Sequence, residues 1–306
     1  MSPFFTVGIP VYNRAQAVRD AVESVLAQTD RDFELVVVDN ASTDGTWEYL
    51  QGLTDPRVRV FRNDTNVGMV PNWRRCVEEA RGSWFKFLMS DDVLFPWALP
   101  TIRGLLERFP DCRVVVAAGV NFKGAIPRPA QVEAEPRFFA VQELRDMARR
   151  FQILPASNPN AYTLSTAEAK AMIATPQYRQ VEERLGATGH DVDFFMLYWC
   201  ALRSPRVVYH PAPLYGVRYH DGNGAKRYFY DLAYRWEGDQ LVRRLLFPTL
   251  PRSRRRELAY LVTMLQGIGL DFVKSLILRR PRPGSLWTAC LQFARAAGKI
   301  AAPSLS

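Results

Sequence analysis

The chain has 306 residues, a net charge of +9 and an apolar content of 48%, values typical of a globular protein with one large domain or two smaller ones. Its cysteines, Cys76, Cys112, Cys200 and Cys290, lie far apart and form no C-x-x-C pair. This spacing argues against a disulfide scaffold and a structural zinc site and favours a reducing, cytoplasmic setting. The N-terminus has no basic region followed by an apolar core, so we expect no secretory signal.

Short apolar runs in the first 118 residues are typical of buried strands, over 5–9, 34–39, 57–61, 84–89 and 113–118. Between them, apolar residues follow helical spacing over 14–28, 46–50 and 72–80. Strands that alternate with helices of this length predict an α/β domain with a largely parallel sheet. Ligands of such folds bind at the carboxyl ends of the strands.

The pattern weakens after residue 120. Prolines interrupt residues 121–160, where we expect loops and a short helix over 141–151. Helical patterns return over 165–174 and 191–203. The last segment, 226–306, looks helical throughout and holds 15 Lys and Arg against 5 Asp and Glu.

This basic C-terminal segment suits an anionic surface, either a membrane or a nucleic acid. One of its predicted helices, 257–278, has an apolar arc opposite Thr263, Asp271 and Lys274. The polar residues that interrupt this helix argue against a membrane-spanning segment. We therefore expect the helix either to complete the core or to lie on a membrane surface. Nucleic-acid binding would need aromatic residues among base-reading polar ones, and arginine and leucine dominate instead, so we do not expect it.

The first chemistry-bearing segment runs from Val7 to Arg14. A strand ends at Pro10, and a turn containing Tyr12 and Asn13 leads into the next helix. Backbone and aromatic groups at such a strand end can contact a flat ring. We therefore expect Pro10, Tyr12 and Asn13 at a ligand site.

The second segment runs from Val38 to Thr46. Asp39 can accept a hydrogen bond from a base imide, and the small residues after it let a ligand approach the backbone. Taken alone, an aspartate here is more often a turn or cap residue. A third segment supplies Asn66 and Asn72, which we expect to shape the site as turn or cap residues.

The fourth segment ends the apolar run 84–89 with two adjacent carboxylates, Asp91 and Asp92. Neighbouring carboxylates repel each other, and this cost is accepted most readily where a cation or a metal-bound polyphosphate lies between them. With Asp39, the pair predicts a nucleotide site at the carboxyl edge of the sheet.

Together and in this order, these segments resemble the family 2 glycosyltransferases of GT-A fold. The resemblance is strong over residues 4–125 and looser to about 225. It implies a Rossmann-like, mostly parallel central sheet flanked by helices, with a helical C-terminal extension. It also implies a nucleotide-sugar-binding half over 1–120, an acceptor-binding half over 121–225 and a basic helical region over 226–306.

In that family, the residue equivalent to Asp39 contacts the nucleotide base, and the residues around Pro10 and Tyr12 line the same pocket. We expect Asn13 and Asn66 at this donor site as well. The family's Asp-x-Asp motif places its second aspartate on Asp91 and its first on Met89. A thioether is a poor ligand for Mg²⁺ or Mn²⁺, so the resemblance assigns the metal to Asp91, with Asp92 in support.

The family's catalytic base is a carboxylate near the start of a later helix. That position falls on Asp191, with Asp193 as the alternative, although Asp191 could instead cap the helix. Arg218 and His220 match an Arg-x-His segment, which implies a diphosphate contact for Arg218 and a metal contact for His220. Trp97 either stacks on a sugar or belongs to the core.

The resemblance implies an inverting, hexosyltransferase-type enzyme that moves a sugar from a nucleotide diphosphate to an acceptor hydroxyl. UDP is the expected nucleotide, with dTDP or GDP as alternatives, and the acceptor a bacterial-type glycan or glycolipid. We expect a divalent metal cofactor, Mn²⁺ or Mg²⁺, and work at the inner face of the cell membrane, in polysaccharide or cell-envelope biosynthesis. The rival readings are a catalytically silent nucleotide-sugar-binding module and a nucleotidyltransferase, although the latter normally has a Gly-rich phosphate loop that is missing after the first strand.

Overall fold

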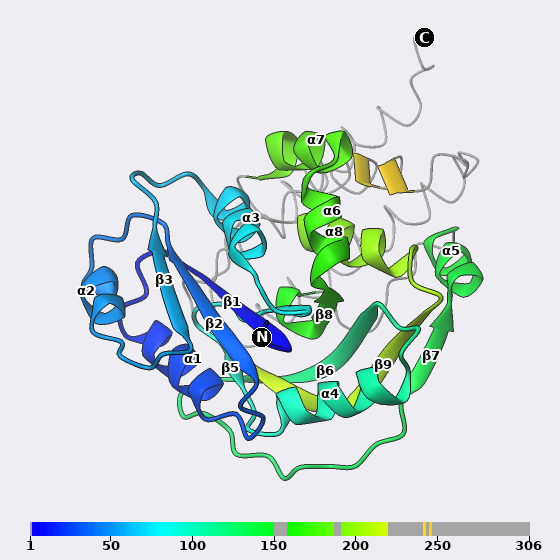
Figure 1. The fold of residues 1–306 in the computed structure, drawn as a ribbon, viewed down its shortest axis with the longest axis horizontal. Coiled ribbons are helices and arrows are strands. Elements are labelled where there is room, and N and C mark those ends of the chain that lie inside the picture. Colours follow the sequence, from blue (N-terminus) through cyan, green and yellow to red (C-terminus); the bar gives the residue numbers. More distant parts are fainter. Residues whose placement is uncertain (1, 150–157, 187–190, 220–240, 243–244, 247–306) are drawn as a thin grey trace, which may run out of the picture.

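The computed structural model describes residues 2–149, 158–186, 191–219, 241–242 and 245–246 (Figure 1). Its strands are β1 Phe5–Val11, β2 Phe33–Asp39, β3 Val58–Arg62, β4 Trp84–Phe87, β5 Val93–Leu94, β6 Val114–Phe122, β7 Arg137–Ala140, β8 Tyr162–Ser165 and β9 Arg206–Arg218. Its helices are α1 Ala17–Leu26, α2 Thr46–Gln51, α3 Met69–Glu79, α4 Ala98–Arg108, α5 Val141–Arg149, α6 Thr166–Ile173, α7 Pro176–Leu185 and α8 Val192–Ala201, with a 3₁₀ turn η1 at Pro159–Ala161.

The strands form one sheet in the order β3-β2-β1-β4-β8-β6-β9-β5, and β7 pairs with β9. Helices cover both faces, with α3, α6 and α8 on one side and α1 and α4 on the other (Figure 1). Every residue of β1 and β2 is buried, as the central strands of a covered parallel sheet must be. The continuous apolar runs in the sequence therefore become the middle of the sheet.

The prediction of a mostly parallel sheet holds for its first part, because β3, β2, β1 and β4 are parallel. The rest of the sheet is mixed. Strand β8 runs antiparallel to both of its neighbours, β4 and β6, and β9 pairs parallel with β6 but antiparallel with β5 and β7. The departure from a parallel sheet begins at β8, which follows β6 in the sequence but lies between β4 and β6 in the sheet.

Most predicted elements are present with shifted ends. The strand predicted over 84–89 ends at Phe87, and the chain then turns, with the Asp92 N–H donating to the Met89 carbonyl at 3.0 Å. The helix predicted from residue 72 begins at Met69, after Gly68 with φ of +93°. The sequence patterns do not predict α4, α7, β8 or β9. The predicted C-terminal helices lie outside the described residues.

Three cysteines of the described part, Cys76, Cys112 and Cys200, are free and buried. They lie in α3, in the turn before β6 and in α8. Burial raises the pKa of each thiol, in the case of Cys112 to about 11. Among the described residues, no helix is both long and apolar enough to cross a membrane.

Candidate active site

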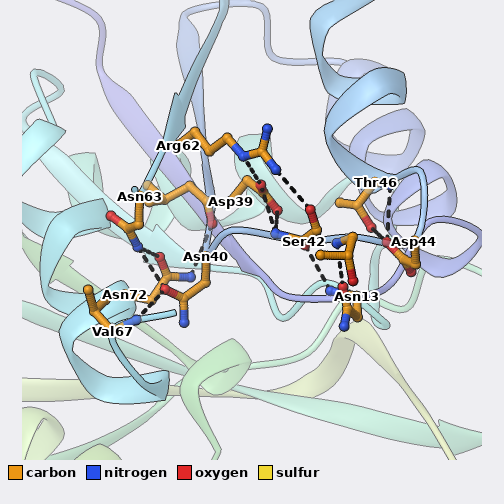
Figure 2. Close-up of polar contacts among 12 residues, drawn as sticks. Asn13, Asp39, Asn40, Ser42, Asp44, Thr46, Arg62, Asn63, Val67 and Asn72 are labelled. Carbon is orange, nitrogen blue, oxygen red and sulfur yellow. Dashed lines mark hydrogen bonds and ion pairs between the residues drawn. The ribbon is translucent and has the colours of Figure 1, made fainter. Parts of the chain in front are cut away.

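The carboxyl end of β2 presents Asp39, whose side chain is 0% exposed. The backbone N–H of Ser42 donates to both of its carboxylate oxygens, at 3.3 and 3.1 Å. The Arg62 Nε lies 3.3 Å from Oδ2, and the same guanidinium donates to the Ser42 carbonyl at 2.9 Å (Figure 2). Asp39 is thus fixed in place by a turn and balanced by one half-exposed cation.

The carboxyl end of β1 is joined to the same turn by Asn13. Its backbone N–H donates to the Ser42 hydroxyl at 2.9 Å, and its Oδ1 accepts from the Thr43 N–H at 2.9 Å. Asn13 has a φ of +50°, in the left-handed region that asparagine tolerates better than most residues. Pro10 is buried inside β1, whereas the Tyr12 side chain is 44% exposed.

Asp44 ties the two loops together a second time. Its carboxylate accepts from the Ala15 N–H at 3.0 Å and from the Thr46 N–H at 3.1 Å. Partial burial works to raise the pKa of Asp44, but the hydrogen bonds from Thr46 and Ala15 outweigh it and hold the pKa below its usual value. The loops after β1 and β2 therefore form one connected wall.

A cluster of asparagine amides supports this wall from the side of β3 (Figure 2). Asn40 donates to Asn66 at 2.8 Å and accepts from Asn63 at 2.9 Å. Asn63 also donates to Asn72 at 2.9 Å, and Asn72 donates to the Val38 carbonyl at 3.1 Å. Asn66 lies in the loop before α3, where its Oδ1 accepts from the Gly68 N–H at 2.9 Å. Asn72 lies inside α3, so the prediction of a turn or cap residue is wrong for Asn72. The expected place of Asn66 at the donor site stays a prediction. Sequence reasoning missed Asn40 and Asn63, although both follow the ends of predicted strands.

The turn after β4 places Asp91 and Asp92 in different environments. The Asp91 side chain is 21% exposed and lies 3.9 Å from the Arg14 Nε. Asp92 is only 4% exposed, and its carboxylate accepts from the Arg218 N–H at 2.7 Å and from the Asn160 amide at 2.6 Å. Burial and the neighbouring Asp91 raise the pKa of Asp92 to about 7, despite those hydrogen bonds.

Asn160 also organises the turn from within the protein. It accepts from the Met89 N–H at 2.7 Å through its side chain and from the Lys86 ammonium at 2.6 Å through its carbonyl. Lys86 is fully buried, and burial lowers its pKa to about 7. The Met89 side chain packs against the hydrophobic core. The position that carries the first aspartate of the family motif is therefore a packing position here.

Arg218 crosses from β9 to the same turn. Its guanidinium donates to the Asp91 carbonyl at 3.1 Å and to the Gly124 carbonyl at 3.2 Å, and it pairs with Asp20 of α1. These contacts join Arg218 to the turn that holds Asp91 and Asp92, the acidic turn, and fasten that turn to α1. The expected diphosphate contact stays a prediction, and His220 lies outside the described residues.

Asp191 stands at the N-cap position of α8 with φ of +63°, but its side chain makes no capping hydrogen bond to this helix. The cap alternative raised by the sequence is therefore wrong for its side chain. Burial raises the pKa of Asp193 to about 7, against the hydrogen bond from the Phe194 N–H. Trp97 stacks on Phe95 with ring centroids 5.5 Å apart.

These observations define a class of protein. The loops after β1, β2 and β4 bring Asn13, Asp39 and Asp91 to the carboxyl edge of parallel strands, where α/β folds bind nucleotides. A model of the family described as "Glycosyl transferase family 2" matches residues 6–160. The chain belongs to glycosyltransferase family 2.

Curated relatives agree with this family. The chain is 37% identical over 106 residues to the succinoglycan biosynthesis protein ExoO of Rhizobium meliloti, covering 35% of this chain and 30% of that protein. It is also 37% identical over 92 residues to the putative teichuronic acid biosynthesis glycosyltransferase TuaG of Bacillus subtilis, covering 29% of this chain and 36% of that one. These matches span about a third of each relative's length.

Solved structures show the same fold. Staphylococcus aureus TarS 1-349 in complex with UDP-GlcNAc matches with a TM-score of 0.68 at 16% identity, over 97% of this chain and 80% of that chain. The mannosyltransferase PcManGT from Pyrobaculum calidifontis, in complex with GDP-Man and Mn²⁺, matches with a TM-score of 0.53 at 17% identity, over 98% and 87%. The prediction of a family 2 glycosyltransferase with a GT-A fold is confirmed.

Proposed function

We propose that this protein is an inverting glycosyltransferase that moves a hexosyl group from a UDP-sugar to a hydroxyl of a glycan or glycolipid. The observation that carries the proposal is the shared edge of β1, β2 and β4, where Asp39 and Asp91 follow the two strands that flank β1. Family membership supports the reaction class. Relatives named for succinoglycan and teichuronic acid biosynthesis support a polysaccharide setting.

The donor nucleotide would lie against the wall formed by the loops after β1 and β2. Asp39 offers a carboxylate that can accept from the imide N–H of uracil. Tyr12, which directly follows β1, offers an exposed aromatic ring, and the base can stack on such a ring. The TarS complex contains UDP-GlcNAc, which supports UDP, whereas the PcManGT complex contains GDP-Man.

The residues of the acidic turn fit a divalent cation that is shared with the donor. Among the described residues, no three acidic, histidine or cysteine side chains gather into a metal site of their own. Mg²⁺ is commonly bound by one or two carboxylates together with substrate phosphates and water. Asp91 is the partly exposed carboxylate that would hold it, because Asp92 faces inward. The cation would stabilise negative charge on the diphosphate leaving group.

Asp191 is the proposed base that takes the proton from the acceptor hydroxyl as the hydroxyl attacks the sugar. It precedes α8, and its side chain does not cap that helix. Asp193 is the alternative base, and its pKa of about 7 would suit proton transfer near neutral pH. One base and one displacement suffice for inversion, without a covalent intermediate.

The test is a thermal-shift and turnover panel with UDP-, GDP- and dTDP-sugars, each with and without Mn²⁺. A ligand at 100 times its dissociation constant stabilises a protein by about 2.7 kcal/mol, enough to detect. We expect the largest shift with a UDP-sugar plus Mn²⁺, together with release of UDP when an acceptor is present. Binding without turnover across the panel would instead support a silent nucleotide-sugar-binding module, and no binding at all would overturn the proposal.

A further inference from the structure

A cavity of about 310 Å³ lies between β6, β9 and the chain just before η1, away from the wall that holds Asp39. Its lining includes Gly119, Asn121, Asn158, Tyr209, Tyr215 and Val217. None of the described residues that line it is charged. The volume is at the small end of the usual range for small-molecule sites, roughly 300–1,000 Å³, which suits a single sugar ring.

The shape of the cavity depends on a glycine. Opposite Gly119 the register of β6 and β9 shifts, and the Tyr215 ring lies against β6. A Cβ on Gly119 would stand 2.3 Å from the Tyr215 Cε2, so no other residue fits there without displacing the ring. The Tyr215 hydroxyl accepts from the Asn158 amide at 3.2 Å. Burial raises the pKa of Tyr215 to about 12, so its hydroxyl keeps its proton and can donate it.

The cavity adjoins the acidic turn on two sides. The Asn158 side-chain oxygen accepts from the Asn160 backbone N–H at 3.0 Å, and the Asn160 side-chain amide in turn donates to Asp92 at 2.6 Å. Val217 directly precedes Arg218, whose backbone N–H also donates to Asp92. A molecule in the cavity would therefore lie beside the place proposed for the donor diphosphate.

The order of the sheet separates this cavity from the nucleoside. Strands β2 and β1 carry Asp39 and Asn13, β4 leads to Asp91, and β6 and β9 lie beyond β8 on the other side of β4. The cavity therefore lies on the other side of the acidic turn from the residues proposed to bind the nucleoside.

The chemistry of the lining selects the kind of acceptor. Two amides and two phenols can donate to and accept from hydroxyl groups, and tyrosine rings can pack on the apolar face of a pyranose. A phosphate, carboxylate or ammonium group would meet no opposite charge among these described lining residues. We propose, on the basis of the proposed function, that this cavity binds an uncharged sugar ring of the acceptor.

The test measures binding of methyl β-glycosides of glucose, galactose, mannose and N-acetylglucosamine to the full chain, by saturation-transfer NMR, with UDP affinity measured in parallel by calorimetry. Methyl β-glucuronide serves as the charged probe. The variants are Asn121→Ala and Tyr209→Leu. Lys170→Ala is the control, because Lys170 lines a separate cavity between α3, α6 and α7.

We expect at least one neutral glycoside to bind and the glucuronide to bind at least tenfold more weakly. Asn121→Ala should weaken the neutral glycoside at least fivefold, with UDP affinity unchanged within twofold, and Lys170→Ala should change neither. Tyr209→Leu should have the same effect as Asn121→Ala.

Equal binding of the glucuronide, no effect of either cavity variant, or no binding of any neutral glycoside would overturn this inference. A parallel loss of UDP affinity in Asn121→Ala would also overturn it, because the cavity would then belong to the donor site. Failure of the native chain to bind UDP would count against the proposed function instead, whatever the glycosides do.

Discussion

Asp91 and Asp92 are adjacent in sequence but have different physical environments. Asp91 is partly exposed beside the Arg14 guanidinium, whereas Asp92 is buried and satisfied by Arg218 and Asn160. Burial and the neighbouring Asp91 together raise the pKa of Asp92 to about 7. The sequence predicts that the pair belongs to a site, but the burial of Asp92 depends on Asn160, which is 68 residues away along the chain.

Replacing the exposed member of the pair should abolish turnover without unfolding the protein. We expect Asp91→Asn to lower kcat by about 100-fold or more, because a metal contact contributes several kcal/mol to transition-state stabilisation. Initial rates with a UDP-sugar at varied Mn²⁺ give the measurement. Asp111→Asn, which alters a surface ion pair with Arg206, is the matched control. If Asp91→Asn turns over as fast as the native chain, Asp91 does not bind the metal.

The carboxylate of Asp39 should govern nucleotide affinity. Asp39→Asn keeps the shape of the side chain but removes the charge that balances Arg62 at 3.3 Å. A hydrogen bond to a charged group contributes about 1.5–3 kcal/mol, so the dissociation constant for UDP should rise by about 10- to 100-fold. Calorimetric titration with UDP measures this. If uridine and UDP bind the variant as they bind the native chain, Asp39 does not contact the base.

At this scale, sequence patterns can single out a side chain that lies within a few residues of its own strand end. Asp39, Asn13 and Asp91 were recognisable because they follow apolar runs. Asn160 and Asp20 were not, since their partners Asp92 and Arg218 lie far along the chain and only the tertiary fold brings them together. The role of Met89 as a packing residue likewise becomes visible only in the folded core.

Among the elements, the parallel half of the sheet could be predicted because β1 and β2 are buried at every position and read as continuous apolar runs. Strand β8 could not, since Tyr162–Ser165 is short and its pairing with β4 and β6 is long-range. Helix α4 had a usable signal, because Leu99, Ile102 and Leu106 follow helical spacing and are buried.

Strand β4 carries a pH-dependent feature in Lys86. Its pKa falls from 10.5 to about 7 on burial, so between these values the unfolded chain binds more protons than the folded one. The free energy of unfolding then rises with pH across this window, and the contribution is lost as pH falls towards 7.

Lys86→Met removes this titration. The difference in unfolding free energy between pH 7 and 9 should be smaller in the variant by about 1–3 kcal/mol, measured by urea denaturation at each pH. Lys170→Met, with an exposed lysine in α6, controls for the loss of one positive charge. Parallel pH profiles for the native chain and Lys86→Met would contradict a depressed pKa at Lys86.

For the whole molecule, charge is divided unevenly along the chain, with 15 basic and 5 acidic residues in 226–306. We expect the full chain to bind vesicles containing anionic lipid. Each basic residue near such a surface contributes about 1 kcal/mol, and salt screens this attraction. Co-sedimentation should show binding that weakens as salt rises from about 0.05 to 0.5 M. Vesicles of neutral lipid are the control, and equal binding to both would exclude an electrostatic contact.

The three buried thiols give this protein a set of internal reporters. A thiol reagent reacts only with a thiolate that it can reach. Burial keeps the thiols of Cys76, Cys112 and Cys200 protonated and shields them from the reagent. Each cysteine can therefore be labelled only when its own part of the molecule opens: helix α3, the turn before β6 or helix α8. In a Cys290→Ser background, labelling rates at the three sites would show which region opens first and which one a bound nucleotide keeps closed.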